Sequence, residues 1–597
     1  MKRVDFKSVE ITGGFWKQRQ ELVRDVTVYA VYDRFKETGR FDALKCDKNA
    51  TIKPHIFWDS DVAKWIEGVA YLLLKEKNTK LEGLVDQMVD DIFENQDKDG
   101  YFNSYYLVNE NEVKFSQRDN HELYCLGHLI EAGVAYFEAT GKKKLLDVCC
   151  KYVGCVYDRF AIKKDTGFTT PGHEEIELAL VRLYEVTGDK MHLDLAMFFL
   201  NERGKDGKLR DWAETRYNQS HAPVREQKTA EGHSVRATYL YCAMADIALK
   251  TGDECLKNAC EAIFDDIVNT KMYITGGIGS SSAGEAFTVP YDLPNMLAYT
   301  ESCAAIGLIL FAHRMLLLTN DAKYSSIIER ALYNGFLSSI SLNGRAFFYC
   351  NPLEIYPQMI ERDSSVTWKS VQLPVTVRQE VFDCSCCPPN IVRFIPSLGN
   401  LLYTTDESTI YLHQFITSRA TIGKTIIEQE TSYPNGNTVK IKVSGKSTTL
   451  CVRIPEFCKN KFENTQNGYA VFSVNDGDEI TLDFDMEPKF VESNSKVLTN
   501  AGKCALVKGP VVYCLEGVDN EINIKSLIID TQSKIENGYN KELDEPTLIV
   551  DAYYKQGTDA LYSQLSHKYE RTRATLIPYY AFANRGQSQM LVWFMYK

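Results

Sequence analysis

The sequence predicts a multidomain α+β protein in which a helical toroid is followed by C-terminal β-sandwich domains. From about residue 16 to 340 the sequence shows the periodicity of amphipathic helices, and one kind of turn recurs along this region. Beyond about residue 400 the pattern changes to short alternating runs rich in β-branched and aromatic residues, which is typical of strands. The length of 597 residues suggests two to four domains.

The composition excludes several classes of protein. With 68 Lys and Arg against 80 Asp and Glu the formal net charge is −12, whereas binding of nucleic acid requires a basic surface. The most apolar helical run, 304–318, is interrupted by His313 and Arg314. It is also shorter than the roughly 20 residues that span a membrane. We therefore expect neither nucleic acid nor a membrane as a partner.

Residues 1–15 predict a strand that joins a β-sandwich, because apolar residues nearly alternate from Val4 to Ile11 before a turn at Gly13-Gly14. No apolar segment follows the first basic residues, so a secretory signal is not predicted. We expect a cytoplasmic protein. There the 17 cysteines would serve as buried thiols, metal ligands or a catalytic thiol more often than as disulfides.

Turns of similar sequence predict a series of helical hairpins. In these turns Gly or Asn follows a helical run, and Gly suits the left-handed position that ends a helix. A repeat of this kind closes into a toroid or remains an open solenoid. The long polar connections 204–232 and 274–298 favour a toroid whose functional site lies at the mouth that carries them. The turns span 138–146, 185–193, 249–257 and 317–325, with 74–82 as a degenerate copy.

The remaining domains are predicted as β-sandwiches at 401–500 and 501–597, which leaves 16–400 as the catalytic domain. Turn signals such as Pro434-Asn435-Gly436 separate the short strands. The sequence leaves open whether these domains brace the toroid or pack between the subunits of a homodimer.

The most specific motif is CSCCPPN at 384–390. Thiolates are soft ligands that suit zinc, and two of these thiols with Glu301 and Cys303 would fill four positions on the metal. A closed structural zinc site or a cluster of buried thiols would use the same residues.

Several polar residues are candidates for one pocket. His121, His173 and His233 lie near predicted helix starts, which converge on one rim of a toroid, although helix capping or core packing also explains them. Glu285 lies in a Gly- and Ser-rich loop, where it is either a general acid or a solvated side chain. A further group either stacks on a sugar or caps and packs a helix: His55, Trp58, Asp59, Asp61 and Trp65.

Segments that cover nearly the whole chain in order resemble glycoside hydrolase family 127. CCPPN together with ESC at 301–303 is the most specific part of this resemblance. The matching segments are FWDSDVAKWIEG (57–68), HELYCLGHLIEA (121–132), PGHEEIELALVRLY (171–184), EGHSVRA (231–237), GEAF (284–287), YTESCAAIG (299–307), FFYCNPLE (347–354), CSCCPPN (384–390) and ALVKGPVVYCLE (505–516).

The resemblance implies a retaining β-L-arabinofuranosidase with an (α/α)6 barrel and C-terminal β-sandwich domains. It implies Cys386 as the nucleophile and Glu285 as the acid/base, acting on L-arabinofuranosides. It also implies that sugar is bound by His121, His173, His233, Tyr349 and Glu301, and that Zn²⁺ is held by Glu301, Cys303, Cys386 and Cys387. It assigns no role to Cys350 or Cys384.

Two other classes of function remain open. One is a hydrolase or lyase of another sugar on the same barrel, although a lyase of acidic saccharides would prefer a basic cleft and the net charge is −12. The other is a non-catalytic carbohydrate-binding protein in which zinc is structural. Substitution of the predicted nucleophile, chelation of the metal and inspection of the product separate these possibilities.

Overall fold

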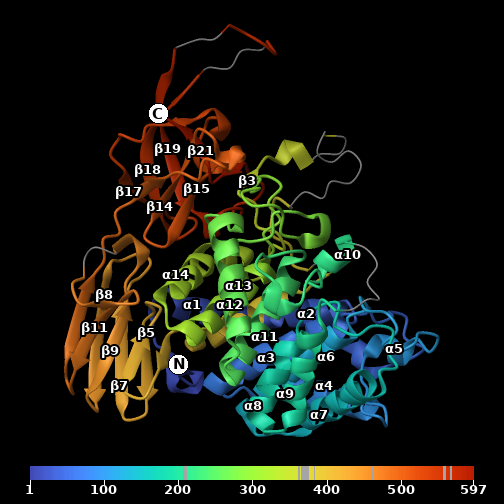
Figure 1. Ribbon diagram of the computed structural model, residues 1–597. Coiled ribbons are helices and arrows are strands. Elements are labelled where there is room, and N and C mark those ends of the chain that lie inside the picture. Colours follow the sequence, from blue (N-terminus) through green and yellow to red (C-terminus); the bar gives the residue numbers. More distant parts are fainter. Residues whose placement is uncertain are drawn as a thin grey trace.

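The computed structural model describes residues 1–205, 212–360, 364, 375–381, 384–458, 462–555, 560–564 and 568–597. In this part of the chain a helical domain, blue to yellow in Figure 1, lies beside an orange β-sandwich, and a red β domain lies above both. This arrangement confirms the predicted fold class, a helical toroid followed by β domains.

The helical domain is a closed ring of inner helices. Within the described residues, α3 contacts α6, α6 contacts α8, α8 contacts α11, α11 contacts α13, α13 contacts α15, and α15 returns to α3. The ring confirms the predicted toroid and excludes the alternative, an open solenoid. The ring consists of α3 (Trp58–Lys75), α6 (Glu122–Thr140), α8 (Ile176–Thr187), α11 (Ser234–Thr251), α13 (Ser302–Thr319) and α15 (Cys387–Phe394).

From α2 to α14 outer helices alternate with the inner ones along the chain, and each of them contacts an inner helix. The predicted turns lie at these junctions, because Gly141, Gly188 and Gly252 end α6, α8 and α11 in the left-handed conformation. The outer helices are α1 (Gly14–Leu22), α2 (Val28–Glu37), α4 (Thr79–Asn95), α7 (Lys144–Tyr157), α9 (Lys190–Glu202), α12 (Glu254–Asp266) and α14 (Ala322–Ala331). The short helices α5 (Ser104–Val108) and α10 (Trp212–Tyr217) lie in connections.

The apolar run around 304–318 is longer than its sequence pattern suggested. As helix α13 it has 18 residues, which by length and composition is enough to cross a membrane, but 78% of it is buried inside the protein. An inner helix of the ring is surrounded by other helices and is therefore apolar on most sides. The apolar character of this segment is explained by its burial in the ring, and not by the insufficient length expected from the sequence.

The middle domain consists of two facing sheets. The N-terminal segment contributes one strand to each sheet, so the single strand predicted in residues 1–15 is two short strands separated by a turn. One sheet has the order β1 (Lys2–Arg3), β4 (Tyr403–Thr405), β5 (Thr409–Leu412), β9 (Thr448–Arg453), β11 (Tyr469–Val474), β10 (Thr465–Gln466). The other has the order β12 (Glu479–Asp483), β8 (Thr438–Gly445), β7 (Thr425–Thr431), β6 (Ser418–Ile422), β2 (Val9–Ile11).

The last domain is β-rich as predicted, but the prediction of a second β-sandwich is wrong, because its main sheet closes on itself. In the described residues β14 pairs with both β21 and β15, so the strands β14, β21, β16, β18, β19 and β15 form a small barrel. Its first strand begins at Lys489, ahead of the predicted boundary at 501. The strands are β13 (Lys489–Val491), β14 (Lys503–Lys508), β15 (Val511–Glu516), β16 (Ile528–Ile529), β17 (Glu536–Asn540), β18 (Glu545–Tyr554), β19 (Glu570–Pro578), β20 (Met590–Leu591) and β21 (Phe594–Tyr596).

This domain holds a segment of the helical domain in place. Strand β3 (Glu354–Ile355) pairs with β20, and Tyr579 Oη donates to the carbonyl oxygens of Asn351 and Pro352, each at 2.9 Å. The segment so fixed begins just after Tyr349, one of the predicted sugar-binding residues. The C-terminal domain thus braces the helical domain, whereas a homodimer remains a prediction.

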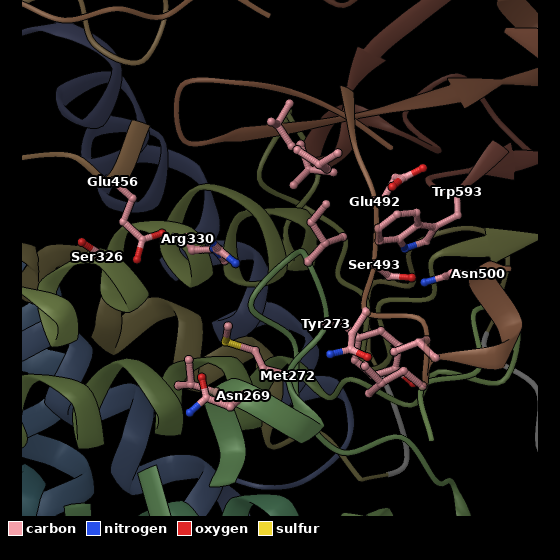
Figure 2. Close-up of a pocket in the computed structure, with 18 of the residues that line it drawn as sticks. Asn269, Met272, Tyr273, Ser326, Arg330, Glu456, Glu492, Ser493, Asn500 and Trp593 are labelled. Carbon is pink, nitrogen blue, oxygen red and sulfur yellow. Dashed lines mark hydrogen bonds and ion pairs between the residues drawn. The ribbon is translucent and has the colours of Figure 1, made fainter. Parts of the chain in front are cut away.

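A cavity of about 430 Å³ lies where the three domains meet. Figure 2 shows Arg330 and Glu456 at one end of it and Trp593 and Asn500 at the other. Arg330 and Glu456 form an ion pair of 3.0 Å between the helical and middle domains. None of the predicted site residues lines this cavity.

Close packing between α6 and the start of α8 gives a test of the ring. A Cβ atom added to Gly127 would lie 2.6 Å from Glu175 Cγ and 2.8 Å from the backbone nitrogen of Ile176. We expect Gly127→Ala to lower the free energy of unfolding by about 1–3 kcal/mol, because the start of α8 must move. Gly154→Ala is the matched control: no described heavy atom lies within 4 Å there, so urea denaturation should show equal or greater stability. Equal stability of both variants would contradict the packing.

Candidate active site and metal centre

The predicted site residues cluster where the inner helices begin. Glu301 is the N-cap of α13, His233 is the N-cap of α11, His121 is the N-cap of α6, and Cys386 is the N-cap of α15. The N-terminus of a helix carries a partial positive charge, which stabilises carboxylates and thiolates. The convergence of these termini therefore favours a cluster of anionic ligands.

The motif CCPPN forms the first turn of α15. Cys387 is its first residue, and Pro388 and Pro389 follow within the first turn. Backbone N–H groups there have no partner inside the helix, so proline is tolerated at these positions. The sequence thus starts a helix immediately after the paired thiols and directs both toward α13.

One carboxylate and three thiols form a compact group. The Sγ atom of Cys303 lies 3.4 Å from that of Cys387 and 3.6 Å from that of Cys386, and the last two are 3.7 Å apart. Glu301 Oε1 lies 3.6 Å from Cys386 Sγ and 3.8 Å from Cys387 Sγ. The group could hold a metal ion.

The spacing of these atoms fits a tetrahedral metal. Two sulfur atoms bound to zinc at 2.3 Å stand about 3.8 Å apart, close to the observed separations. Burial alone raises the pKa of Cys303, but hydrogen bonding with Cys386 and Cys387 outweighs burial and lowers it to about 6. Among the described residues Glu301 Oε2 is buried without a hydrogen-bond partner. The donor set suits a soft or borderline divalent ion.

Three histidines lie next to one another beside the group of Glu301 and the three thiols, called the metal group from here on. The ring of His173 lies 5.8 Å from that of His121 and 5.5 Å from that of His233. Burial lowers the pKa of His121 to about 3 and that of His173 well below its usual range, and the positive charge of Arg236 adds to both shifts. Neutral imidazoles can both accept and donate hydrogen bonds, which suits sugar hydroxyls.

The hydrogen bonds indicate which ring nitrogen carries the proton. His173 Nδ1 lies 3.1 Å from the carbonyl oxygen of Glu174, so Nδ1 carries the proton and Nε2 is an acceptor. His233 Nδ1 accepts from the backbone of Val235 and Arg236, so its Nε2 is the donor. His233 therefore caps α11 and also contacts Glu285, whereas its role in binding sugar stays a prediction.

Glu285 accepts the hydrogen bond that His233 Nε2 donates. Its Oε2 lies 2.8 Å from His233 Nε2, and one of its oxygens lies within 4.8 Å of Glu301. Burial raises the pKa of Glu285, but the interaction with His233, chiefly the hydrogen bond that Nε2 donates, outweighs burial and lowers it. Its backbone has φ of +52°, and residues with such strain cluster at functional sites. Glu285 thus points into the cluster rather than into solvent.

Tyr349 lies beside the thiols. Its Oη is 3.5 Å from Cys386 Sγ and 3.9 Å from Cys384 Sγ. Cys384 is exposed beside the metal group, while Cys350 is buried and pairs through its backbone with Glu301. All predicted site residues are therefore brought together by the structure.

The proposed sugar-stacking group mostly serves the helix packing. Asp61 forms an ion pair with Arg40 at 3.0 Å, and Asp59 accepts hydrogen bonds from Ser104. Trp65 is buried and donates to the backbone of α2. His55 is exposed, with its ring 4.2 Å from that of Phe57 near the site rim.

Other residues of the site were not predicted from the sequence. Tyr124 stacks against His173 with ring centroids 4.1 Å apart, and Arg236 contacts the backbone of Gly172 at 2.5 Å. Each lies three residues after a helix-capping histidine, His121 or His233, and therefore on the same helix face. That spacing is the signal from which they could have been found.

Comparison with known proteins identifies related sequences along the whole chain. Residues 8–400 match the β-L-arabinofuranosidase GH127 catalytic domain. Residues 409–486 match the β-L-arabinofuranosidase GH127 middle domain, and residues 488–595 match the glycoside hydrolase family 127 C-terminal domain.

Whole relatives agree with these matches. The chain is 32% identical to a non-reducing end β-L-arabinofuranosidase of Bifidobacterium longum subsp. longum, covering 98% of this chain and 99% of the relative. The crystal structure of a GH127 β-L-arabinofuranosidase from Geobacillus stearothermophilus T6 superposes with a TM-score of 0.93 at 38% identity, covering 99% and 100% of the two chains. The structure of another GH127 β-arabinofuranosidase superposes with a TM-score of 0.90 at 34% sequence identity, covering 100% of this chain and 98% of that chain. The family resemblance in the sequence is therefore confirmed, and this chain belongs to glycoside hydrolase family 127, the β-L-arabinofuranosidases.

Proposed function

We propose that this enzyme is a retaining exo-acting hydrolase that releases terminal β-L-arabinofuranose through the sulfur of Cys386. The observation that carries this proposal is that two groups lie close to one carboxylate, Glu301. One is Cys386 Sγ in the thiol group, and the other is Glu285, which is paired with His233. A nucleophile and an acid/base on either side of one small space are what a two-step glycosidase requires. The names of the relatives support the choice of sugar.

In the first step the Cys386 sulfur attacks the anomeric carbon, and the bond from that carbon to the aglycone oxygen breaks. The departing oxygen takes a proton from Glu285, which must bind that proton before the step. In the second step Glu285 removes a proton from water, the water oxygen bonds to the anomeric carbon, and the sulfur leaves as a thiolate. Two inversions at one carbon give net retention.

The metal group is proposed to bind Zn²⁺ through Glu301, Cys303, Cys386 and Cys387. A bound zinc ion keeps coordinating thiols deprotonated. The protein's own contribution is orientation: Tyr349 Oη beside Cys386 Sγ, and the neutral His121, His173 and His233, would fix the hydroxyls of a five-membered sugar. Glu301 is proposed to contact the sugar through its second oxygen.

Removal of the metal tests this centre. We expect dialysis against a strong chelator to abolish hydrolysis of an aryl β-L-arabinofuranoside, and one equivalent of Zn²⁺ to restore it, because the metal keeps the thiol nucleophile ionised. Metal content, activity and far-ultraviolet circular dichroism are measured together. Activity retained in protein shown to be metal-free would contradict the proposal. Unfolding in step with metal loss would instead favour a structural zinc.

We also propose that the protein acts in the cytoplasm. All seventeen cysteines fall within the described residues, and each is a free thiol there. A reducing compartment keeps such thiols available. Measurement of the protein's distribution between cell fractions tests this expectation.

A further inference from the structure

The leaving group of the proposed reaction must lie on the same side of the sugar as Glu285. The departing oxygen takes its proton from Glu285, so the aglycone begins within hydrogen-bonding reach of that carboxyl group. The side chain of Glu285 is 32% exposed, whereas that of His233 is 7% exposed and Glu301 is buried. Solvent therefore reaches the site at Glu285, and a group bound there is free to extend outward.

Tyr217, the last residue of α10, lies beside this opening. A Cβ atom added to Gly284, the residue before Glu285, would lie 3.5 Å from Cδ2 of the Tyr217 ring, which is ordinary van der Waals contact. The backbone carbonyl of Tyr217 accepts a hydrogen bond of 3.1 Å from the backbone nitrogen of His233, and the backbone of His233 in turn pairs with Ala286. Tyr217 is thus joined to the segment that carries Glu285.

A glycine makes this close approach possible. A Cβ atom added to Gly232 would lie 2.0 Å from the carbonyl oxygen of Arg216 and 2.8 Å from Tyr217 Cα. The φ of Gly232 is +67°, where a residue with a Cβ is strained. The sequence therefore holds the end of α10 directly against the start of α11.

The ring of Tyr217 is held in place, while its hydroxyl is not used by the protein. The guanidinium carbon of Arg236 lies 4.3 Å from the ring centroid, and the ring of His233 lies edge-on at 5.8 Å. Tyr217 is partly exposed, and among the described residues no group hydrogen-bonds to its Oη. A fixed aromatic ring with a free hydroxyl is a preformed contact for a ligand.

We propose that Tyr217 is a specificity-determining residue that binds the leaving group and favours an aglycone that is itself a sugar. This inference rests on the proposed role of Glu285. The aromatic ring presents an apolar surface to the C–H groups of the aglycone sugar, and Oη hydrogen-bonds to one of its hydroxyls. A methyl aglycone has neither the area nor the hydroxyl for these contacts, so its cleavage does not depend on Tyr217.

Hydrolysis of two substrates by the full-length enzyme tests the proposal. One is a disaccharide with a terminal β-L-arabinofuranosyl group on a pentose, and the other is methyl β-L-arabinofuranoside. Both leaving groups are alcohols that need a proton from Glu285, so the two substrates differ only in the contacts of the aglycone. We expect Tyr217→Ala to lower kcat/KM for the disaccharide about tenfold, as loss of a hydrogen bond and a ring contact would, and to keep that for the methyl glycoside within about twofold of the parent.

Tyr105→Ala is the matched control. Tyr105 is also a partly buried tyrosine in a short connecting helix, α5. In the described part of the chain it contacts Tyr106 and Glu112 and none of the predicted site residues. This variant should hydrolyse both substrates as the parent does.

The outcomes are distinct. A parent protein that hydrolyses neither substrate would overturn the proposed function itself. An active parent whose ratio of kcat/KM for the two substrates is unchanged in a folded, active Tyr217→Ala would overturn only the role of Tyr217. Should Tyr217→Ala fail to fold by circular dichroism or lose activity on both substrates, Tyr217→Phe decides, because it keeps the ring and removes the hydroxyl. A lower kcat/KM of Tyr217→Phe for the disaccharide alone supports the proposal, and any other result contradicts it.

Discussion

Replacing Cys386 with alanine is expected to reduce kcat/KM for an aryl β-L-arabinofuranoside by about 10⁴-fold or more, the scale seen when a covalent nucleophile is removed. The structure supports this size of effect, because in the described residues Cys386 Sγ is the thiol that lies beside both Glu301 and Tyr349. Neighbouring groups would bind the sugar but form no bond to its anomeric carbon. Steady-state hydrolysis with circular dichroism as a check on folding measures the effect.

Loss of a metal ligand could also inactivate this variant, and azide separates the two causes. In Cys386→Ala a small anion takes the space of the sulfur, so azide should restore turnover and give a glycosyl azide of inverted configuration. Cys384→Ala is the matched control, because it removes an exposed thiol two residues away that lies outside the group of four ligands. Substantial hydrolysis by Cys386→Ala without azide would contradict its assignment as nucleophile.

Glu285→Gln is expected to lower kcat by about 10²–10⁴-fold, the range for a general acid/base. The loss should be smaller in the first step for a substrate whose leaving group needs no protonation, so a burst of released phenol should precede slow turnover. Gln keeps the size of the side chain and can still contact His233 Nε2. Rapid-mixing kinetics on substrates of different leaving-group pKa check this prediction.

Azide again gives a decisive outcome for this variant. It attacks the sugar–sulfur intermediate without needing a base, so the product should be a glycosyl azide of retained configuration, opposite to that from Cys386→Ala. Unaltered kinetics of Glu285→Gln, or an inverted azide product, would remove Glu285 from the acid/base role. A non-catalytic role for the protein would leave both variants without any kinetic phenotype.

Local signals in the sequence were sufficient to predict the helical ring. Gly141, Gly188 and Gly252 each end an inner helix at positive φ, where a residue with a Cβ is strained. Closure of the last domain could not be predicted, because β14 pairs not only with its neighbour in the chain, β15, but also with β21, which lies at the far end of the domain in sequence. Strand patterns indicate that a segment pairs, but not with which partner.

In the site, too, some features could be predicted from the sequence and others could not. Residue type and spacing predicted that Glu301, Cys303 and two of the three thiols at 384–387 could hold a metal, and the family resemblance implied Cys386 and Cys387 as those two. The structure brings these four residues together. For Asp59, Asp61 and Trp65 the sequence left two alternatives open, a sugar-stacking wall or helix capping and packing. The structure favours the second. The sequence could not decide, because their partners Ser104, Arg40 and the backbone of α2 are distant in sequence.

The most direct test of the sugar–sulfur bond is mass spectrometry of Glu285→Gln quenched during its burst with an activated aryl β-L-arabinofuranoside. The variant should form the intermediate and hydrolyse it slowly. The intact protein should then gain the mass of one pentosyl group, and peptide mapping should place that group on Cys386. A pentosyl group on another residue, or none on protein that has released its phenol, would contradict the account.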